Sequence, residues 1–340
     1  MNVWQATLVF LIAAGVLVQA GAALAAYADQ IASRLKLSRM FVGTLLLAFA
    51  TSLPELTTDI TAARAGAPDL AVGDLFGSSM ANMAILAIID LIYRGHVWPS
   101  VELGHARVAA VAIGLTALAA GALYLPYELA IGWVGVTPIA ILAIYVAAVA
   151  WFRRTPLLAR PGVGSSPEIP LQRPTGWSRD AARVSSRGLW IRFLGAAFVI
   201  FMAAPVATLS VKAITEATGL AESFGGATLL AVTTSLPELI ASLAAIRIGA
   251  YDMAVGNLFG SNVANMSVLF FADLAYTEGP ILAAVSQVHV VSALGAILMM
   301  AIAVAAIVGD SETRLRRFEP DAVVLLLAYA AALTAIALAG

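Results

Sequence analysis

The sequence predicts an all-α membrane protein with ten transmembrane helices in two inverted five-helix repeats and with broken helices at the bilayer midplane. Three observations support this fold class: an apolar composition, ten apolar stretches and an internal repeat. Of the 340 residues, 61% are hydrophobic and 11% are charged, whereas soluble domains average about 45–50% and about 25%. The mean hydropathy is +0.93. This composition excludes a soluble enzyme and a nucleic-acid-binding protein.

The ten apolar stretches are separated by proline, glycine or charged residues. Each is long enough to cross a bilayer, which takes about 20 residues per helix. No lysine or arginine precedes the first stretch, so it is predicted to be a membrane helix and not a cleaved signal. The stretches cover residues 3–28, 40–64, 69–93, 106–125, 128–151, 189–214, 222–248, 252–276, 280–308 and 320–339.

The basic residues predict the orientation of these helices. With the N-terminus outside, all of the 19 lysines and arginines except Arg64 and Lys212 fall on the cytoplasmic side, as the positive-inside rule requires. The C-terminus then also lies outside, and residues 152–188 form a cytoplasmic loop. This loop is rich in proline, glycine, serine and arginine, which is typical of a linker. We expect a multi-pass protein of a prokaryotic inner (cell) membrane.

Two long motifs occur once in each half of the chain. Residues 43–55 align with 226–238, and residues 73–83 align with 256–266, always 183 positions apart (238 minus 55). Because each half holds an odd number of helices, the halves have opposite orientations in the membrane. We therefore expect residues 1–151 to form the first repeat, with its motifs at 43–83. Residues 152–188 are the linker, and residues 189–340 form the second repeat, with its motifs at 226–266.

The first motif is TSLPE, at residues 51–55 and 234–238. Its proline lacks an N–H group, so the carbonyl four residues earlier loses its helical partner and the helix kinks or breaks. A glutamate in hydrocarbon is costly and is by default functional. Carbonyls, hydroxyls and carboxylates are hard oxygen ligands that suit Na⁺ and Ca²⁺. The candidate ligands of this motif are Ala50, Thr51, Ser52 and Glu55, with Thr233, Thr234, Ser235 and Glu238 in the second half.

The second motif gives each half a polar stripe on one helix face. Asp74, Ser78 and Asn82 follow at i, i+4 and i+8, and Asn257, Ser261 and Asn265 match them. The neighbouring glycines have the small-xxx-small spacing of close helix packing. Asp74, Ser78, Asn257 and Ser261 are added to the candidate ligands. With Glu55 and Glu238, Asp74 would give the site up to three negative charges, which one Ca²⁺ with a monovalent ion, or three Na⁺, would neutralise.

Together these motifs resemble the repeats of the calcium/cation antiporter superfamily, whose best-known members are sodium/calcium exchangers. The resemblance covers the whole chain. It implies a secondary active antiporter in which the candidate residues above line the ion sites, and in which the first and sixth helices slide past a fixed core. The TSLPE form of the motif favours Na⁺ as the counter-ion to Ca²⁺ over H⁺. Ca²⁺ and Na⁺ are then the transported ions, with no organic cofactor, and the lipid bilayer is the only other expected partner.

The sequence departs from this pattern at two positions. Ser79 stands where the second half has Asn262, and Asp59, one helical turn beyond Glu55, stands where it has Ser242. A fourth carboxylate could bind a proton or K⁺, or could line the outward vestibule. Asp59 is therefore a possible accessory residue, and it keeps a Ca²⁺/H⁺ antiporter open as an alternative.

Other functions and sites have weaker support in the sequence. An intramembrane hydrolase would need a catalytic motif such as GxSxG, which is missing, and a passive channel would need an open pore instead of a cage. Zero cysteines and three histidines argue against thiolate or haem chemistry. Asp90 and Asp273 are expected at helix ends, capping or facing water, and His289 is expected to be an interfacial or hydrogen-bonded histidine. We expect no obligate protein partner.

Overall fold

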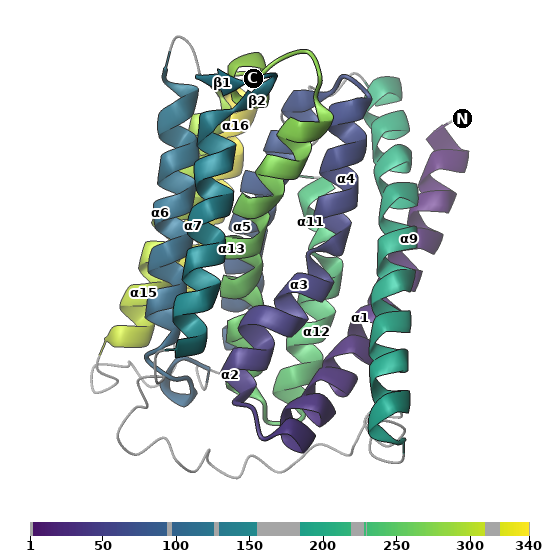
Figure 1. Ribbon diagram of the computed structural model, residues 1–340, viewed down its shortest axis with the longest axis vertical. Coiled ribbons are helices and arrows are strands. Elements are labelled where there is room, and N and C mark those ends of the chain that lie inside the picture. Colours follow the sequence, from purple (N-terminus) through teal and green to yellow (C-terminus); the bar gives the residue numbers. More distant parts are fainter. Residues whose placement is uncertain are drawn as a thin grey trace.

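A computed structural model describes residues 3–93, 97–125, 129–154, 184–218, 228, 230–309 and 320–339. The described part of the chain is almost entirely helical (Figure 1). It contains eight helices long and apolar enough to cross a membrane, and a shorter apolar helix at Val136–Phe152. The expected seventh span, 222–248, is described continuously only from Leu230. Most of the expected linker, residues 155–183, lies outside the described residues.

The first half contains five long helical segments, the second of which is interrupted. Its elements are α1 (Val3–Leu35), α2 (Arg39–Phe41), the π-helix η1 (Val42–Leu47), α3 (Ala48–Thr51), α4 (Leu53–Arg64), α5 (Pro68–Ile92), the 3₁₀ helix η2 (Trp98–Ser100), α6 (His105–Leu123), β1 (Ala130–Ile131), β2 (Val134–Gly135) and α7 (Val136–Arg154). Helix α1 is about 50 Å long at 1.5 Å per residue, and it crosses the bundle obliquely (Figure 1).

The second half repeats this order. Its elements are α9 (Ser186–Thr218), α11 (Ala231–Thr234), α12 (Leu236–Arg247), α13 (Tyr251–Ala275), α14 (Ile281–Ala284), α15 (His289–Val308) and α16 (Pro320–Ala339). The turn between α4 and α5 and the turn between α12 and α13 match in detail. Gly66 and Gly249 have φ angles of 71° and 74°, a left-handed conformation that glycine adopts without strain.

The two halves run in opposite directions through the bundle. We name the end where α7 stops and α9 starts the linker face, and the end where α1 starts and α16 stops the termini face (Figure 1). Helix α5 starts at the termini face, whereas its counterpart α13 starts at the linker face. Ten helices in an inverted repeat are consistent with this arrangement.

Helices α5 and α13 form the centre of the molecule. Most residues of both are buried, including every polar residue except Asp69 and Asp252 in their first turns. They pack against each other and against both interrupted helices. Helices α1 and α9 lie side by side at the edge of the bundle (Figure 1). The polar stripes of the second motif therefore face protein and not lipid.

Both TSLPE segments interrupt their helices, as expected. The break is at Ser52 (φ −83°, ψ 7°) between α3 and α4, and at Ser235 (φ −80°, ψ 2°) between α11 and α12. Pro54 and Pro237 lie in the first turns of α4 and α12, where a missing N–H costs no helical bond. The π-helix η1 precedes the first break, and such bulges are frequent at functional sites.

Three expected helix boundaries are wrong. The first helix continues to Leu35, beyond the expected end at residue 28. The fifth starts at Val136 and not at residue 128, because a hairpin with Gly132 at φ 68° turns the chain back between β1 and β2. The ninth starts at His289 and not at residue 280, because the short α14 precedes it. The first helix continues through polar residues such as Asp29 and Arg34, which hydropathy alone assigns to a connection. Before the fifth and ninth helices the connections are mostly apolar, so hydropathy does not separate them from the helix.

Asp90 and Asp273 lie near the ends of α5 and α13, as expected, but both are fully buried and do not face water. Their carboxylates accept backbone N–H bonds from the segments that follow, and Asp273 also accepts one from β2 of the first half. Asp90 accepts from Val97 at 3.2 Å, and Asp273 accepts from Ile281 at 2.6 Å and Gly135 at 2.7 Å. These aspartates hold the connecting segments against the central helices.

Two aspartate–histidine pairs join the halves, one at each face. At the termini face, Asp69 Oδ1 lies 2.8 Å from His289 Nε2, and at the linker face Asp252 Oδ1 lies 3.0 Å from His105 Nε2. Asp69 and Asp252 are equivalent in the repeat, and each is in the first turn of a central helix. Both histidine rings are buried. His289 is thus hydrogen-bonded, as expected.

We expect His289→Ala and His105→Ala each to lower the thermal unfolding midpoint. The substitution removes a buried hydrogen-bond partner, which costs about 1–3 kcal/mol. Thermal unfolding of detergent-purified protein measures the change. His→Gln keeps an N–H donor and is expected to recover part of the loss. Unchanged midpoints in both alanine variants would show that the pairs contribute nothing to stability.

Candidate ion-binding site

Each interrupted helix contacts the central helix of the opposite half. Thr51 Oγ1, just before the first break, lies 3.0 Å from Asn257 Oδ1 and 3.5 Å from Ser261 Oγ on α13. Thr234 Oγ1, just before the second break, lies 3.1 Å from Asp74 Oδ1 and 3.1 Å from Ser78 Oγ on α5. All six side chains are buried. The motifs that are far apart in sequence thus come together in two equivalent clusters.

Glu55 and Glu238 lie close to these clusters. Both are fully buried. Glu55 is close enough to Glu238, Asp74 and Asp59 for like-charge repulsion. Neither oxygen of Glu55 has a hydrogen-bond partner, whereas Glu238 Oε1 accepts a bond of 3.3 Å from Ser261 Oγ. Buried carboxylates without compensating donors are unfavourable unless a cation or proton neutralises them.

The remaining predicted residues of the TSLPE motifs are buried at the two breaks. Ser52 and Ser235 are the break residues themselves, and their hydroxyls have no partner. Ala50 and Thr233 are also buried. Their carbonyls precede Pro54 and Pro237 by four residues, so the usual helical donor is missing. All twelve predicted ligands are therefore buried, and eight of them are joined by hydrogen bonds or charge proximity where the two halves meet.

Asp59 belongs to the same region and not to a vestibule. It is fully buried, and its carboxyl group is within hydrogen-bonding reach of Asp74. Asp59 Oδ1, Asp59 Oδ2 and Asp74 Oδ2 have no hydrogen-bond donor. The expectation that Asp59 could line an outward vestibule is wrong, because the residue has no exposed surface.

Three asparagines of the central helices were not among the predicted ligands, although they continue the same polar stripes. Asn82 Nδ2 donates to Asn262 Oδ1 at 2.8 Å across the α5–α13 contact. The equivalent contact in the other direction is missing, because Ser79 stands opposite Asn265. Ser79 Oγ donates instead to Leu75 O at 3.0 Å. Both side-chain polar atoms of buried Asn265 therefore lack a partner, and Asn265 becomes a further candidate ligand.

The glycines of the second motif pack helices closely, as expected. A Cβ atom at Gly256 would lie 2.9 Å from Thr44 Oγ1, and one at Gly260 would lie 2.3 Å from Thr44 O. These distances are too short for any larger residue. The glycines let α13 approach η1, which carries the chain towards Thr51.

No group of three or more histidine, aspartate or glutamate side chains converges tightly enough to hold a metal ion among the described residues. Carboxylates at this spacing need hydroxyl, amide and carbonyl oxygens to complete a coordination shell. The two clusters supply such oxygens. This composition suits hard cations such as Na⁺ and Ca²⁺ and not transition metals.

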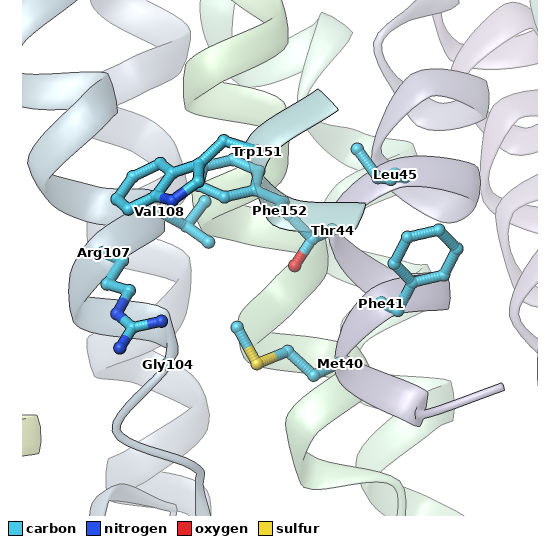
Figure 2. Close-up of a pocket in the computed structure, with 9 residues that line it drawn as sticks. All are labelled: Met40, Phe41, Thr44, Leu45, Gly104, Arg107, Val108, Trp151 and Phe152. Atoms are coloured by element: carbon cyan, nitrogen blue, oxygen red, sulfur yellow. The ribbon is translucent and has the colours of Figure 1, made fainter. Parts of the chain in front are cut away.

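A pocket near the linker face is a separate feature (Figure 2). Trp151 and Phe152 of α7 lie over it, Met40 lies on the opposite side, and the Thr44 hydroxyl points into it. Arg107 contributes the only charge among its lining residues. A mostly apolar pocket beside an arginine does not suit a cation, and none of the predicted ligands lines it.

A model of the sodium/calcium exchanger protein family matches residues 5–153 and 188–338. The chain belongs to this family. It is therefore an integral membrane cation antiporter of the sodium/calcium exchanger family, a class of transporters and not of enzymes.

Similar proteins include a putative antiporter, CaxA, from Alkalimonas amylolytica, which is 28% identical over 80% of this chain and 82% of its own length. The inner membrane protein YrbG of Escherichia coli is 29% identical over 71% of both chains. The sodium/calcium exchanger from Methanococcus jannaschii has a solved structure that covers 98% of this chain and 99% of its own, with a TM-score of 0.63 and 19% identity. That likeness shows a shared fold.

Proposed function

We propose that this exchanger moves Ca²⁺ and Na⁺ in opposite directions through the buried region around Glu55 and Glu238. The observation that carries the proposal is the approach of two fully buried glutamates at the two helix breaks, with Asp74 close to both. Glu55 has no hydrogen-bond donor, and only one oxygen of Glu238 has one. Three carboxylates can be neutralised by Ca²⁺ with one monovalent cation or by three Na⁺. Both loads use the same oxygens, so they compete, and competition for one site is the basis of exchange.

Alternating access in this proposal uses α1 and α9 as the moving pair. A Cβ atom at Gly21 of α1 would lie only 3.0 Å from Pro237 O, so α1 runs directly along the second helix break. Helix α9 packs in the same way along α4, beyond the first break. Sliding of these two helices would uncover the site first on one face and then on the other. The buried α5–α13 core would stay fixed.

We further propose that the linker face is cytoplasmic. Arg34, Arg107 and Arg192 are among the basic residues at this face, whereas Arg64 lies at the termini face. The positive-inside rule then orients both termini outward. An accessibility assay with single cysteines is unambiguous in this cysteine-free chain. Labelling of a cysteine at Arg64 from the outside, and at Lys36 only after permeabilisation, is the expected result.

The proposed exchange is tested in proteoliposomes. An outward Na⁺ gradient is expected to drive ⁴⁵Ca²⁺ uptake, and an outward H⁺ gradient at equal Na⁺ is expected to drive none. Uptake with the H⁺ gradient alone would make the protein a Ca²⁺/H⁺ antiporter. That second candidate is favoured by Asp59, which adds a fourth buried carboxylate. Uptake that needs neither gradient and does not saturate would indicate a channel.

We expect Asp74→Asn to weaken Ca²⁺ transport more than Na⁺ transport. Removing one negative charge from the cage reduces the attraction of a divalent ion about twice as much as that of a monovalent ion in the same field. Thr234 and Ser78 can still donate to the amide oxygen, so the cluster should remain folded. Apparent affinities from ⁴⁵Ca²⁺ and ²²Na⁺ flux measure the two effects. Equal losses for both ions would contradict the assignment of Asp74 as a charge-supplying ligand.

A further inference from the structure

The two halves differ at one pair of equivalent positions inside the site. In the second half, Asn257 Nδ2 donates to Ser242 Oγ at 3.2 Å, and Ser242 Oγ donates to Ala254 O at 3.3 Å. In the first half, the equivalent residues are Asp74 and Asp59. A serine and an asparagine can form a hydrogen bond with each other. Two ionised carboxylates have only acceptor atoms, so they cannot form a hydrogen bond with each other.

The first-half pair is buried and incomplete. Asp59 and Asp74 are both fully buried and face each other within hydrogen-bonding reach. Asp74 Oδ1 accepts from Thr234 and Ser78, but Asp74 Oδ2 and both oxygens of Asp59 have no donor. Three carboxylate oxygens of this contacting pair are therefore buried without a donor. Two ionised carboxylates at this distance in a buried site repel each other strongly unless a positive charge lies between them.

We propose that Asp59 and Asp74 bind one hard monovalent cation, Na⁺ or K⁺, at a site that the second half does not have. The inference rests on the proposed function, because Asp74 also contributes to the exchange site. Carboxylate oxygens favour hard cations. Calcium requires six to eight oxygens, more than this pair offers, and a second divalent ion would be repelled by the first.

The extra site changes the charge balance of the cage. Glu55, Glu238, Asp74 and Asp59 together carry four negative charges when ionised. One Ca²⁺ leaves two of them to be neutralised, so the Ca²⁺-loaded protein needs two monovalent cations, one of them beside Asp59. The Na⁺-loaded protein likewise holds one monovalent ion more than a cage of three carboxylates would.

The experiment exchanges the pairs between the halves. The double variant Asp59→Ser with Asp74→Asn copies the second-half pair, which the fold already accommodates at equivalent positions. The variant Ser242→Asp with Asn257→Asp places the carboxylate pair in the second half. Asp59→Asn is the third variant, because it removes one charge with almost no change in size. Bound cations are counted on purified protein with ²²Na⁺, and with ⁸⁶Rb⁺ as the K⁺ congener, at constant pH and with Ca²⁺ chelated.

We expect Asp59→Asn to bind one monovalent cation fewer than wild type, and the Asp59→Ser, Asp74→Asn variant, which loses two carboxylates, to bind two fewer. The Ser242→Asp, Asn257→Asp variant gains two carboxylates and is expected to bind more monovalent cations than wild type. The isotope in which the difference occurs identifies Na⁺ or K⁺. Equal counts in wild type, the first double variant and Asp59→Asn would overturn the proposal. In that case a proton, and not a metal cation, neutralises the pair. The counts need no Ca²⁺ transport, so failure of Na⁺-driven uptake would overturn only the proposed function.

Discussion

Glu55→Gln and Glu238→Gln are each expected to abolish Na⁺-driven Ca²⁺ exchange. Both glutamates are fully buried at the two helix breaks. A neutral amide keeps the size of the side chain but supplies no negative charge to a divalent ion. Removing one partner of a buried charge pair costs about 3–5 kcal/mol, which corresponds to a loss of affinity on the order of a hundredfold or more. ⁴⁵Ca²⁺ uptake by proteoliposomes under a Na⁺ gradient measures the effect.

The same two variants are not expected to lose thermal stability in the absence of cations. In the ion-free protein these carboxylates repel each other and Glu55 has no hydrogen-bond donor. The amide removes part of that repulsion, so the thermal midpoint without cations should stay the same or rise. Glu278→Gln is the matched control, because Glu278 is exposed in the connection before α14. Exchange retained in either buried variant, or lost equally in the control, would contradict the site.

Most of this candidate site can be predicted from the sequence alone, because two kinds of signal are local. A proline inside an apolar stretch marks the helix break wherever the helix packs, and an i, i+4 spacing places Asp74 and Ser78 on one face whatever that face contacts. The internal repeat then adds the orientation of the halves. These three inferences depend only on neighbouring residues or on the similarity of the two halves. None of them requires knowledge of the tertiary contacts.

The contacts between the halves could not be inferred in this way. Asp69 and His289 are 220 positions apart, and Asp252 and His105 are 147 apart. Nothing in their local sequence marks them as partners. The consequence of Ser79 is similar. The sequence shows a serine where an asparagine is expected, but only packing shows that Asn265 on the opposite helix loses both its partners.

The start of the fifth helix illustrates a different limit. Residues 129–135 are as apolar as a membrane helix, but they form a small antiparallel hairpin with Ala130 opposite Gly135. Asp273 of the other half accepts the N–H of Gly135 at 2.7 Å and so supports the turn. Hydropathy measures only the cost of exposure to water. It does not tell which backbone groups find a partner elsewhere in the fold.

Gly260→Ala is expected to have the largest effect on folding of any single-methyl substitution at the described glycines. The new Cβ atom would lie 2.3 Å from Thr44 O and 2.8 Å from Ala48 Cβ. The nearest obstacle is backbone and not the end of a flexible side chain, so η1 or α13 must move. Overpacking of this kind costs about 1–3 kcal/mol and at times more. Because η1 leads directly to Thr51, its displacement should also separate Thr51 from Asn257, now 3.0 Å apart.

Gly114→Ala is the matched control, since Gly114 lies within α6 and a Cβ there would meet nothing within 4 Å. An alanine at an open helical position stabilises by about 0.5–1 kcal/mol. The two variants add the same methyl group, and we expect opposite shifts of the thermal midpoint: down for Gly260→Ala and up for Gly114→Ala. Gly260→Ala protein that still folds should also bind ²²Na⁺ more weakly, because the misplaced η1 reaches the site. A normal midpoint with normal Na⁺ binding in that variant would mean that the close approach of η1 to α13 is not required to hold the site together.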